Sequence, residues 1–140
     1  ANNQLFCQDA EVSSFQGHAD ALVTLLDGSK AILELKTAKN SSFMRFKNHG
    51  LLAWSASYYA QLQAYMGMMG ISRGVLLCMN KDTSELHCEW IVYDDVYYHE
   101  LRVKALVISV VEEPPERINK SPLYYMCARC QYKSICHSGG

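Results

Sequence analysis

The sequence predicts an α/β fold built around a mixed sheet, with a cysteine-rich segment at its carboxyl end. Strand-like and helix-like stretches follow one another in the order strand, strand, helix, strand, strand, helix. The chain has 140 residues, of which 49% are hydrophobic and 19% charged, so it is long enough for one domain with its own core. Half of the six cysteines fall between residues 127 and 136. We therefore predict a single domain over residues 1–140 with a metal-binding segment at 122–137.

The first half of the chain is predicted to form a hairpin, a loop and a helix. Alternating apolar and polar residues are typical of strands, and Asp27-Gly28 is a turn signal between two such runs. The helical stretch that follows has Gly70 as its stop. The predicted elements are strands over 11–15, 19–26 and 30–36, a loop over 40–54 that contains Asn40-Ser41-Ser42 and His49-Gly50, and a helix over 55–69.

The second half is predicted to add two strands and a helix. Two apolar runs are joined by a polar turn, and paired prolines at 114–115 prevent the next helix from continuing. The last twenty residues have no clear periodicity, so a hydrophobic face does not hold them. The predicted elements are strands over 74–79 and 86–93, a turn over 80–85 and a helix over 95–111.

The alternation of apolar and polar residues predicts which residues pair across the hairpin. A two-residue loop at 27–28 would make paired residue numbers sum to 55 and would mix apolar and polar side chains on both faces. A three-residue loop over 27–29 makes them sum to 56 and brings Asp20, Glu34 and Lys36 to one face. The opposite face then holds six apolar residues, namely Ala21, Val23, Leu25, Ala31, Leu33 and Leu35.

Two carboxylates and a lysine on one strand face suit a hard divalent cation and a water molecule. Asp20 and Glu34, with the Leu35 carbonyl, supply the oxygen ligands that Mg²⁺ or Mn²⁺ prefers. Lys36 is placed to orient the attacking water and to offset charge that builds on a phosphate. These residues predict phosphodiester hydrolysis. The alternative is an ordinary surface ion pair, because Glu-x-Lys is frequent in half-exposed strands.

The order of these residues resembles the PD-(D/E)XK nuclease superfamily, in particular its RecB-like exonuclease branch. GHAD at 17–20, ELK at 34–36 and QLQAY at 61–65 follow the branch's order of G-x-x-D, E-x-K and Q-x-x-x-Y. The resemblance covers residues 11–70 and 122–137. It implies a restriction-endonuclease-like core with a central mixed sheet flanked by helices.

The resemblance also implies roles for single residues. Asp20 and Glu34 become metal ligands and Lys36 the catalytic lysine, while Gln61 and Tyr65 belong to the catalytic site on its DNA side. Read without the family, Gln61 and Tyr65 are an ordinary helix face, since they stand four residues apart.

Three late cysteines have the spacing of a metal centre, Cys127-x₂-Cys130-x₅-Cys136. The motif resembles the carboxyl-terminal cysteine motif of CRISPR-associated and helicase-associated RecB-like nucleases. That resemblance implies a [4Fe-4S] cluster with one early cysteine as its fourth ligand, and Cys7 is the early cysteine here.

Other assignments of the cysteines remain open. Zinc held by the three late cysteines and His137 is the main alternative, although adjacent Cys136 and His137 are awkward partners for one tetrahedral ion. Thiols without any metal are another. Cys78 and Cys88 lie in strand-like runs and are expected to be small buried side chains.

The net charge of −1 argues against a protein coated in positive charge, so contact with DNA has to come from a local patch. We expect Lys39, Arg45 and Lys47, with Gln61 and Tyr65, to bind DNA; a solvated lysine-rich loop is the alternative. Five aromatic residues nearby are expected to be mostly core, with stacking on unpaired bases as the alternative. They are Phe43, Phe46, Trp54, Tyr58 and Tyr59.

Together these observations predict a metal-dependent DNA nuclease, of exonuclease type, that acts in recombination, replication or repair. No apolar run spans a bilayer and no signal peptide is seen, so we expect a cytoplasmic protein of a bacterium, an archaeon or a phage-infected cell. A recombination or replication protein is the expected partner. The alternatives are a non-catalytic DNA-binding or adaptor module that keeps the nuclease fold, and a structural zinc-ribbon protein.

Overall fold

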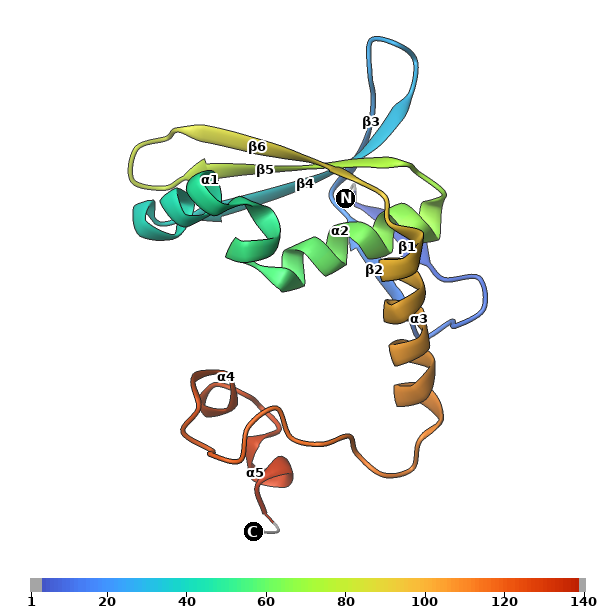
Figure 1. Cartoon of the computed structure of the whole chain (residues 1–140), viewed down its shortest axis with the longest axis vertical. Coiled ribbons are helices and arrows are strands. Elements are labelled where there is room, and N and C mark those ends of the chain that lie inside the picture. The colour runs from blue at the N-terminus through green and yellow to red at the C-terminus, as the bar shows by residue number, and fades with distance from the viewer. Residues whose placement is uncertain (1–3, 139–140) are drawn as a thin grey trace. The chain divides into compact units, whose positions relative to one another are not determined.

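A computed structural model of the chain describes residues 4–138. The chain divides into two compact units, Ala1–Ser109 and Val110–Gly140 (Figure 1). The second unit thus begins upstream of the cysteine-rich segment predicted at 122–137. Among the described residues, none of the helices is both long and apolar enough to cross a membrane.

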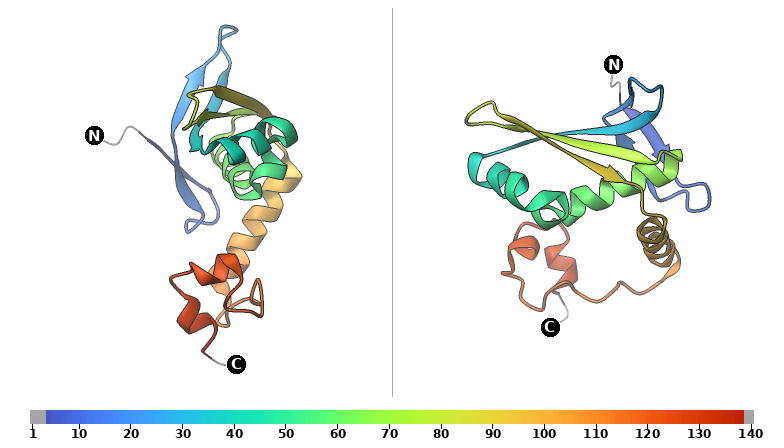
Figure 2. Two further views of the ribbon diagram at one scale, coloured as in Figure 1. Left: turned by 90° about the vertical axis from the view of Figure 1, so that its left-hand side faces the viewer. Right: turned by 45° about the horizontal axis from the view of Figure 1, so that its top comes forward.

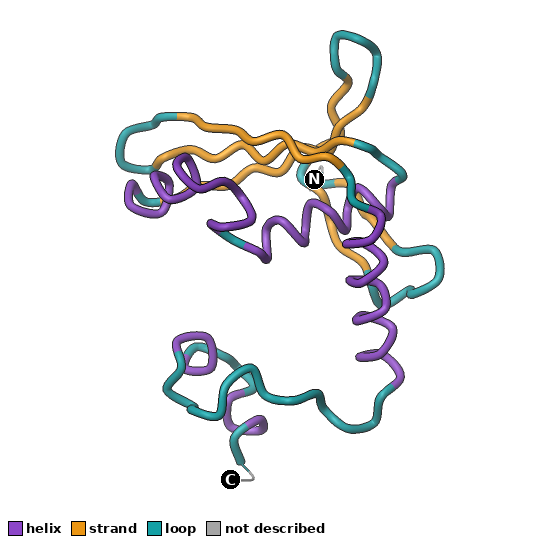
Figure 3. Tube along the Cα trace, viewed as in Figure 1, coloured by secondary structure: helices purple, strands orange, loops and turns teal. Residues whose placement is uncertain are grey.

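The first unit contains nearly all of the regular structure (Figure 3). Its elements are β1 (Leu5–Gln8), β2 (Gln16–Ala19), β3 (Ala21–Thr24), β4 (Lys30–Ala38), α1 (Asn40–Trp54), α2 (Ala56–Met69), β5 (Arg73–Asn80), β6 (Leu86–Val92) and α3 (Asp95–Val110). The second unit holds two single-turn helices, α4 (Tyr125–Ala128) and α5 (Lys133–Cys136).

A four-stranded mixed sheet is the centre of the first unit. Its strand order is β3-β4-β5-β6, with β4 and β5 parallel and the other pairs antiparallel, while β1 and β2 form a separate two-stranded sheet. Helices α1 and α2 lie along one face of the four-stranded sheet (Figure 2). On the other face Leu35, Met79 and Trp90 are exposed. The predicted α/β fold with a central mixed sheet and helices packed on it is therefore confirmed.

The β3–β4 hairpin has the predicted loop length and parity but a different register. Paired residue numbers sum to 54, as in Ala21 with Leu33, so the predicted sum of 56 is wrong. The loop covers residues 26–28 because Gly28, with φ of +81°, closes it in a conformation that glycine adopts readily. Since the sum stays even, the same residues still share a face.

The face of β4 that packs against the helices is the one that carries Glu34 and Lys36, and the face that carries Leu33 and Leu35 lies on the other side of the sheet. Ile32 and Glu34 of β4 turn toward the helices and are 0% and 1% exposed, whereas Leu35 on the opposite face is 51% exposed. Cys88, expected to be buried, is exposed because strand alternation places it beside Leu86 and Trp90 on the open face. Cys78 is buried as predicted.

The strand predicted over 11–15 is wrong. Buried Asp9 accepts hydrogen bonds from the amides of Glu11 and Val12 at 2.9 and 2.8 Å, and this holds the segment as a turn between β1 and β2. Asp9 also accepts a hydrogen bond from the Tyr98 hydroxyl of α3. A short aspartate side chain that bonds nearby amides competes with strand formation.

The loop predicted over 40–54 is wrong too, because these residues form α1. Phe43, Phe46 and Leu51 are fully buried on its inner face. Gly50, with φ of +80°, interrupts the helix, and the Glu89 carboxylate accepts a hydrogen bond from the Leu51 amide at 2.7 Å where the helix resumes. Tertiary packing thus outweighs the turn-like residues at both ends of the segment.

The strand predicted over 19–26 is broken at Asp20, between β2 and β3, and ends at Thr24. The other elements match their predictions closely. Ser55 caps α2 by accepting a hydrogen bond from the Tyr58 amide, and α2 ends before Gly70 as expected. The strands β5 and β6 and the helix α3 begin and end within two residues of the predicted positions.

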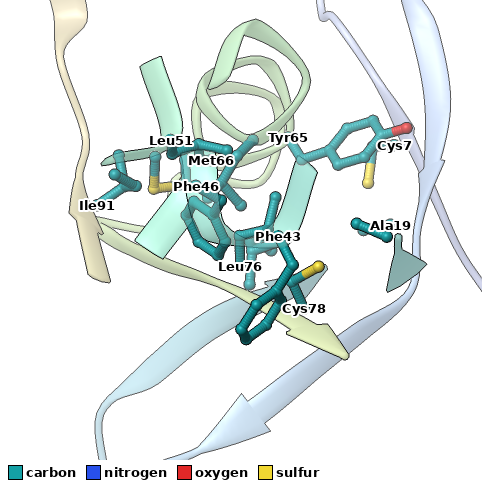
Figure 4. Packing of buried hydrophobic residues seen from close by; sticks show 13 residues of the cluster. Cys7, Ala19, Phe43, Phe46, Leu51, Tyr65, Met66, Leu76, Cys78 and Ile91 are labelled. Carbon is teal, nitrogen blue, oxygen red and sulfur yellow. The ribbon is translucent and has the colours of Figure 1, made fainter. Parts of the chain in front are cut away.

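A single apolar cluster joins the helices to the sheet in the first unit (Figure 4). Phe43 and Phe46 are its largest fully buried side chains, and Trp54, Tyr58 and Tyr59 pack against it as partly buried residues. The expectation that these aromatic residues are mainly core is therefore confirmed.

Replacing Gly67 in α2 by alanine should destabilise the protein, although glycine to alanine usually stabilises a helix by about 1 kcal/mol. A β-carbon at Gly67 would lie 2.4 Å from the ring of Tyr98, which is buried and bonded to Asp9 through its hydroxyl. We expect Gly67→Ala to lower the free energy of unfolding by about 1–3 kcal/mol in urea titrations. The exposed Ser57→Ala variant of the same helix is the control and should change little. A Gly67→Ala protein as stable as the wild type would contradict this close packing.

Candidate active site

Asp20 lies at the bend where β2 ends and β3 begins, directly across from Glu34 of β4. Its Oδ2 accepts a hydrogen bond from the Leu35 amide at 2.9 Å, and its own amide donates to Glu34 Oε1 at 3.2 Å. Its Oδ1 accepts from the Gln4 side chain at 2.9 Å. Sequence reasoning did not find Gln4, because β1, which follows it, was not predicted.

Glu34 is one of the most deeply buried polar residues of the first unit, at 1% exposure. It stands on the helix-covered face of β4, so the sheet and α2 shield it from water. Besides the Asp20 amide, it bonds to Lys36, whose Nζ lies 2.8 Å from Glu34 Oε2. The structure therefore brings Asp20, Glu34 and Lys36 together, as the sequence predicted.

Lys36 is held by a second contact that the sequence did not reveal. Its Nζ lies 5.1 Å from the centre of the Tyr58 ring in α2, a cation–π arrangement. The ring is in turn tilted against Trp54, with 5.3 Å between ring centres. Tyr58 stands three residues before Gln61, and this spacing places both on one side of α2.

The two carboxylates differ in how readily they ionise. Partial burial raises the pKa of Asp20, but hydrogen bonds from the Leu35 amide and Gln4 and the Lys36 charge outweigh it, so the pKa is lowered overall. Burial raises the pKa of Glu34, and the bond to Lys36 offsets this only in part. Asp20 thus ionises first, and its charge further disfavours that of Glu34.

The raised pKa of Glu34 should appear in the pH dependence of stability. A carboxyl group whose pKa is higher in the folded state stabilises the fold fully below its unfolded pKa, near 4.5, and loses this contribution as pH rises through the folded pKa. Glu34→Gln does not ionise. We therefore expect its free energy of unfolding to increase relative to the wild type as pH rises from 4.5 to 8.

Urea titrations at several pH values in the presence of EDTA would test this. Glu100→Gln, an exposed change on α3, is the control for replacing a carboxylate by an amide. Asp20 acts in the opposite direction, because its lowered pKa contributes stability that is lost as pH falls. If the difference in free energy of unfolding between the wild type and Glu34→Gln stays constant with pH, this would contradict a raised pKa of Glu34.

Gln61 and Tyr65 form a pair on α2. The Gln61 amide donates to the Tyr65 hydroxyl at 3.0 Å, and Tyr65 is 7% exposed. The Tyr65 ring lies against Gly17 of β2, so closely that a β-carbon there would come within 2.8 Å of the hydroxyl oxygen. In the described part of the chain, neither residue hydrogen-bonds to the two carboxylates. Their predicted role toward DNA stays a prediction.

The three predicted basic residues are exposed on or beside α1. Lys47 is paired with Glu85, and the Arg45 guanidinium donates to the Ala53 carbonyl at 3.2 Å. Lys39 precedes the first residue of α1. Two of the three thus have partners within the protein, and DNA binding by this patch stays a prediction.

The predicted cluster ligands fall in different units. Cys7 of β1 is 2% exposed and lies beside Tyr65 in the core cluster (Figure 4), where its thiol donates to the Leu5 carbonyl at 3.4 Å. Burial raises the pKa of the Cys7 thiol. Cys127, Cys130 and Cys136 belong to the second unit, where they line one cavity of about 220 Å³.

The donor atoms of the acidic site fit a hard divalent cation. Asp20 and Glu34 offer carboxylate oxygens. Burial disfavours the charged form of Glu34, Lys36 offsets this only in part, and a bound cation would stabilise that form further. Across residues 4–138, no three histidine, cysteine or carboxylate groups already stand in a metal-binding arrangement. Two carboxylates with a main-chain carbonyl are nevertheless a sufficient protein contribution for Mg²⁺, which keeps several waters.

Comparison with known proteins supports the fold. No protein-family model matches the chain, and no curated protein matches it. Among solved structures, the crystal structure of SSO0001 is similar to it with a TM-score of 0.57 and 19% sequence identity. The match covers 88% of this chain and 51% of that one, so the chain spans about half the length of SSO0001. At this level of identity, the likeness shows the fold alone.

Proposed function

We propose that the chain is the core of a metal-dependent DNA nuclease that hydrolyses phosphodiester bonds. One observation carries the proposal: Asp20, at the bend before β3, donates its amide to Glu34 of β4, and the same buried Glu34 carboxylate accepts a hydrogen bond from Lys36. A buried carboxylate with a raised pKa, next to a second carboxylate and a lysine, is more typical of a catalytic site than of a surface ion pair.

Asp20 and Glu34, with the Leu35 carbonyl, would hold Mg²⁺ or Mn²⁺. When bound, such a cation activates water and stabilises charge on phosphate. Lys36 contributes a fixed positive charge beside the carboxylates, and its contacts with Glu34 and Tyr58 hold its Nζ in place. In that position it orients the attacking water and offsets charge on the phosphate.

The second unit would carry the cofactor that the resemblance implies, a [4Fe-4S] cluster, with zinc as the alternative. Three thiols around one cavity fit a thiophilic metal centre. Cys7 does not fit as it stands, because its sulfur is packed in the core of the first unit. We assign the metal centre a role in holding residues 110–138 and no role in hydrolysis.

Cleavage of end-labelled DNA would test the proposal. Single-stranded and double-stranded oligonucleotides labelled at either end would be incubated with Mg²⁺, with Mn²⁺ or with EDTA. We expect cleavage that requires a divalent cation and shortens the DNA progressively from an end. The Asp20→Asn, Glu34→Gln double variant, purified identically, controls for contaminating nucleases. DNA binding without cleavage under every condition would contradict the proposal and favour the adaptor alternative.

A further inference from the structure

The second unit has too little packing to hold its own shape. Cys127 is the one buried side chain in residues 110–138, while apolar Ile118, Leu123 and Ile135 are 69%, 80% and 75% exposed. Both of its helices have only four residues. A segment this short needs a cross-link, a metal or a partner to fold.

Its three cysteines line one cavity, although they do not stand in a metal-binding arrangement with one another or with His137. The Cys130 amide donates to the Cys127 carbonyl at 3.1 Å, so a turn joins the two residues of the Cys-x₂-Cys pair, and both line the cavity. Cys136 ends α5 and faces the same cavity. The cavity is lined by Cys127, Cys130, Cys136 and His137, together with Ile118 and Met126.

His137 is the second observation that points to a ligand. Its Nε2 is buried, and among residues 4–138 it has no hydrogen-bond partner, the one buried side-chain nitrogen or oxygen in this position. A buried polar atom without a partner is unfavourable, and it commonly marks a site completed by water or an ion. His137 lines the same cavity as the three cysteines.

Cys7 has the opposite surroundings. It is packed among Ala19 and Tyr65 in the core of the first unit, and its thiol has a hydrogen-bond partner in the Leu5 carbonyl. Using Cys7 as a ligand would require its buried side chain to leave this core, where Cys7 stands opposite Gly17 of β2. His137 requires no such rearrangement.

We propose that Cys127, Cys130, Cys136 and His137 hold a thiophilic metal centre within the second unit, and that Cys7 is not one of its ligands. Three thiolates with one imidazole are an established set for structural zinc, and histidine also replaces cysteine in some iron–sulfur centres. Binding would draw the four donors closer and thereby order the unit. The inference changes the ligands of the cofactor in the proposed function and does not depend on nuclease activity.

Metal content of the full-length chain would test this inference. The wild type, Cys7→Ala, His137→Ala and Cys130→Ala would be purified without oxygen and reconstituted with zinc or with iron and sulfide. Bound zinc, iron and sulfide would be measured per folded protein, together with visible absorption. We expect Cys7→Ala to retain the wild-type metal content, while His137→Ala and Cys130→Ala lose it or release it to a chelator at least about tenfold more readily.

His137→Cys is a second variant that tests the role of position 137 as a ligand if His137→Ala fails to fold. It restores a thiophilic donor at the same position, so we expect it to retain metal. Brown protein with iron and sulfide would identify a cluster, and colourless protein with one zinc would identify a zinc site; either supports the four ligands. The proposal is overturned if Cys7→Ala loses metal while His137→Ala keeps it, or if the reconstituted wild type binds neither metal. These outcomes are read without any nuclease assay.

Discussion

Lys36→Ala should lose DNA hydrolysis by about 10²–10⁴-fold while keeping its fold and its affinity for DNA, if the proposed function is correct. Lys36 is partly exposed, with 18% of its side chain accessible, so its removal leaves the core intact. Its Nζ stands 2.8 Å from Glu34, at the point where the attacking water would be oriented. The loss should therefore appear in kcat and leave KM nearly unchanged.

Lys30→Ala is the matched control for this experiment. Lys30 is on the same strand and the same side of β4, but it is exposed at the hairpin end, where it pairs with Thr24. It removes the same charge from the protein without touching the carboxylates. Equal losses for both variants would mean that Lys36 acts through general attraction of DNA, and an active Lys36→Ala protein would contradict the proposed mechanism.

Phe46→Ala should lower the free energy of unfolding by about 3–5 kcal/mol. Phe46 is fully buried, stacked on Trp54 with 4.8 Å between ring centres and in edge contact with His87 at 4.9 Å. Its removal leaves a cavity between α1 and the sheet that these rings fill only in part. Urea titration should show a lower midpoint with an unchanged slope.

Leu52→Ala provides the control on the same helix. Leu52 is 54% exposed, so its truncation should change stability by less than about 1 kcal/mol. The comparison also tests the alternative that Phe46 stacks on unpaired bases. A stable Phe46→Ala protein with weakened binding to single-stranded DNA would favour base stacking over a core role.

Elements with one clear signal were predictable from the sequence. The stop at Gly70 ends α2 as predicted, and two apolar runs separated by a polar turn mark β5 and β6. The meeting of Asp20 with Glu34 was predictable even though the register was not. Any hairpin register with an even sum puts these two residues on the same face, and the sums 54 and 56 are both even.

Other features depend on residues far apart in the sequence and could not be predicted. The helix α1 begins at Asn40, whose amide donates to Asp82, and resumes after Gly50 under a hydrogen bond to Glu89. Neither partner is visible in a local pattern. The same holds for Lys47, whose charge is paired with Glu85 across the unit.

The burial of Cys7 was unpredictable for a related reason. A lone early cysteine has the same sequence pattern whether it binds metal or packs in a core. Only the pairing of β1 with β2, which brings Cys7 opposite Gly17 and close to Tyr65, distinguishes the two. Likewise, the sequence alone does not indicate that His137 Nε2 is buried without a hydrogen-bond partner in a residue that lines the cavity.

The parallel pairing of β4 with β5 has a consequence for how the chain folds as it is synthesised. Ile32 pairs with Gly74, and α1 and α2 make up the connection between them. Parallel neighbours need such long crossovers, and contacts of this kind form slowly. A ribosome therefore releases the β3–β4 hairpin, with Glu34 still in water, well before its neighbouring strand exists. Glu34 becomes dehydrated only when the late strand and α2 close over it.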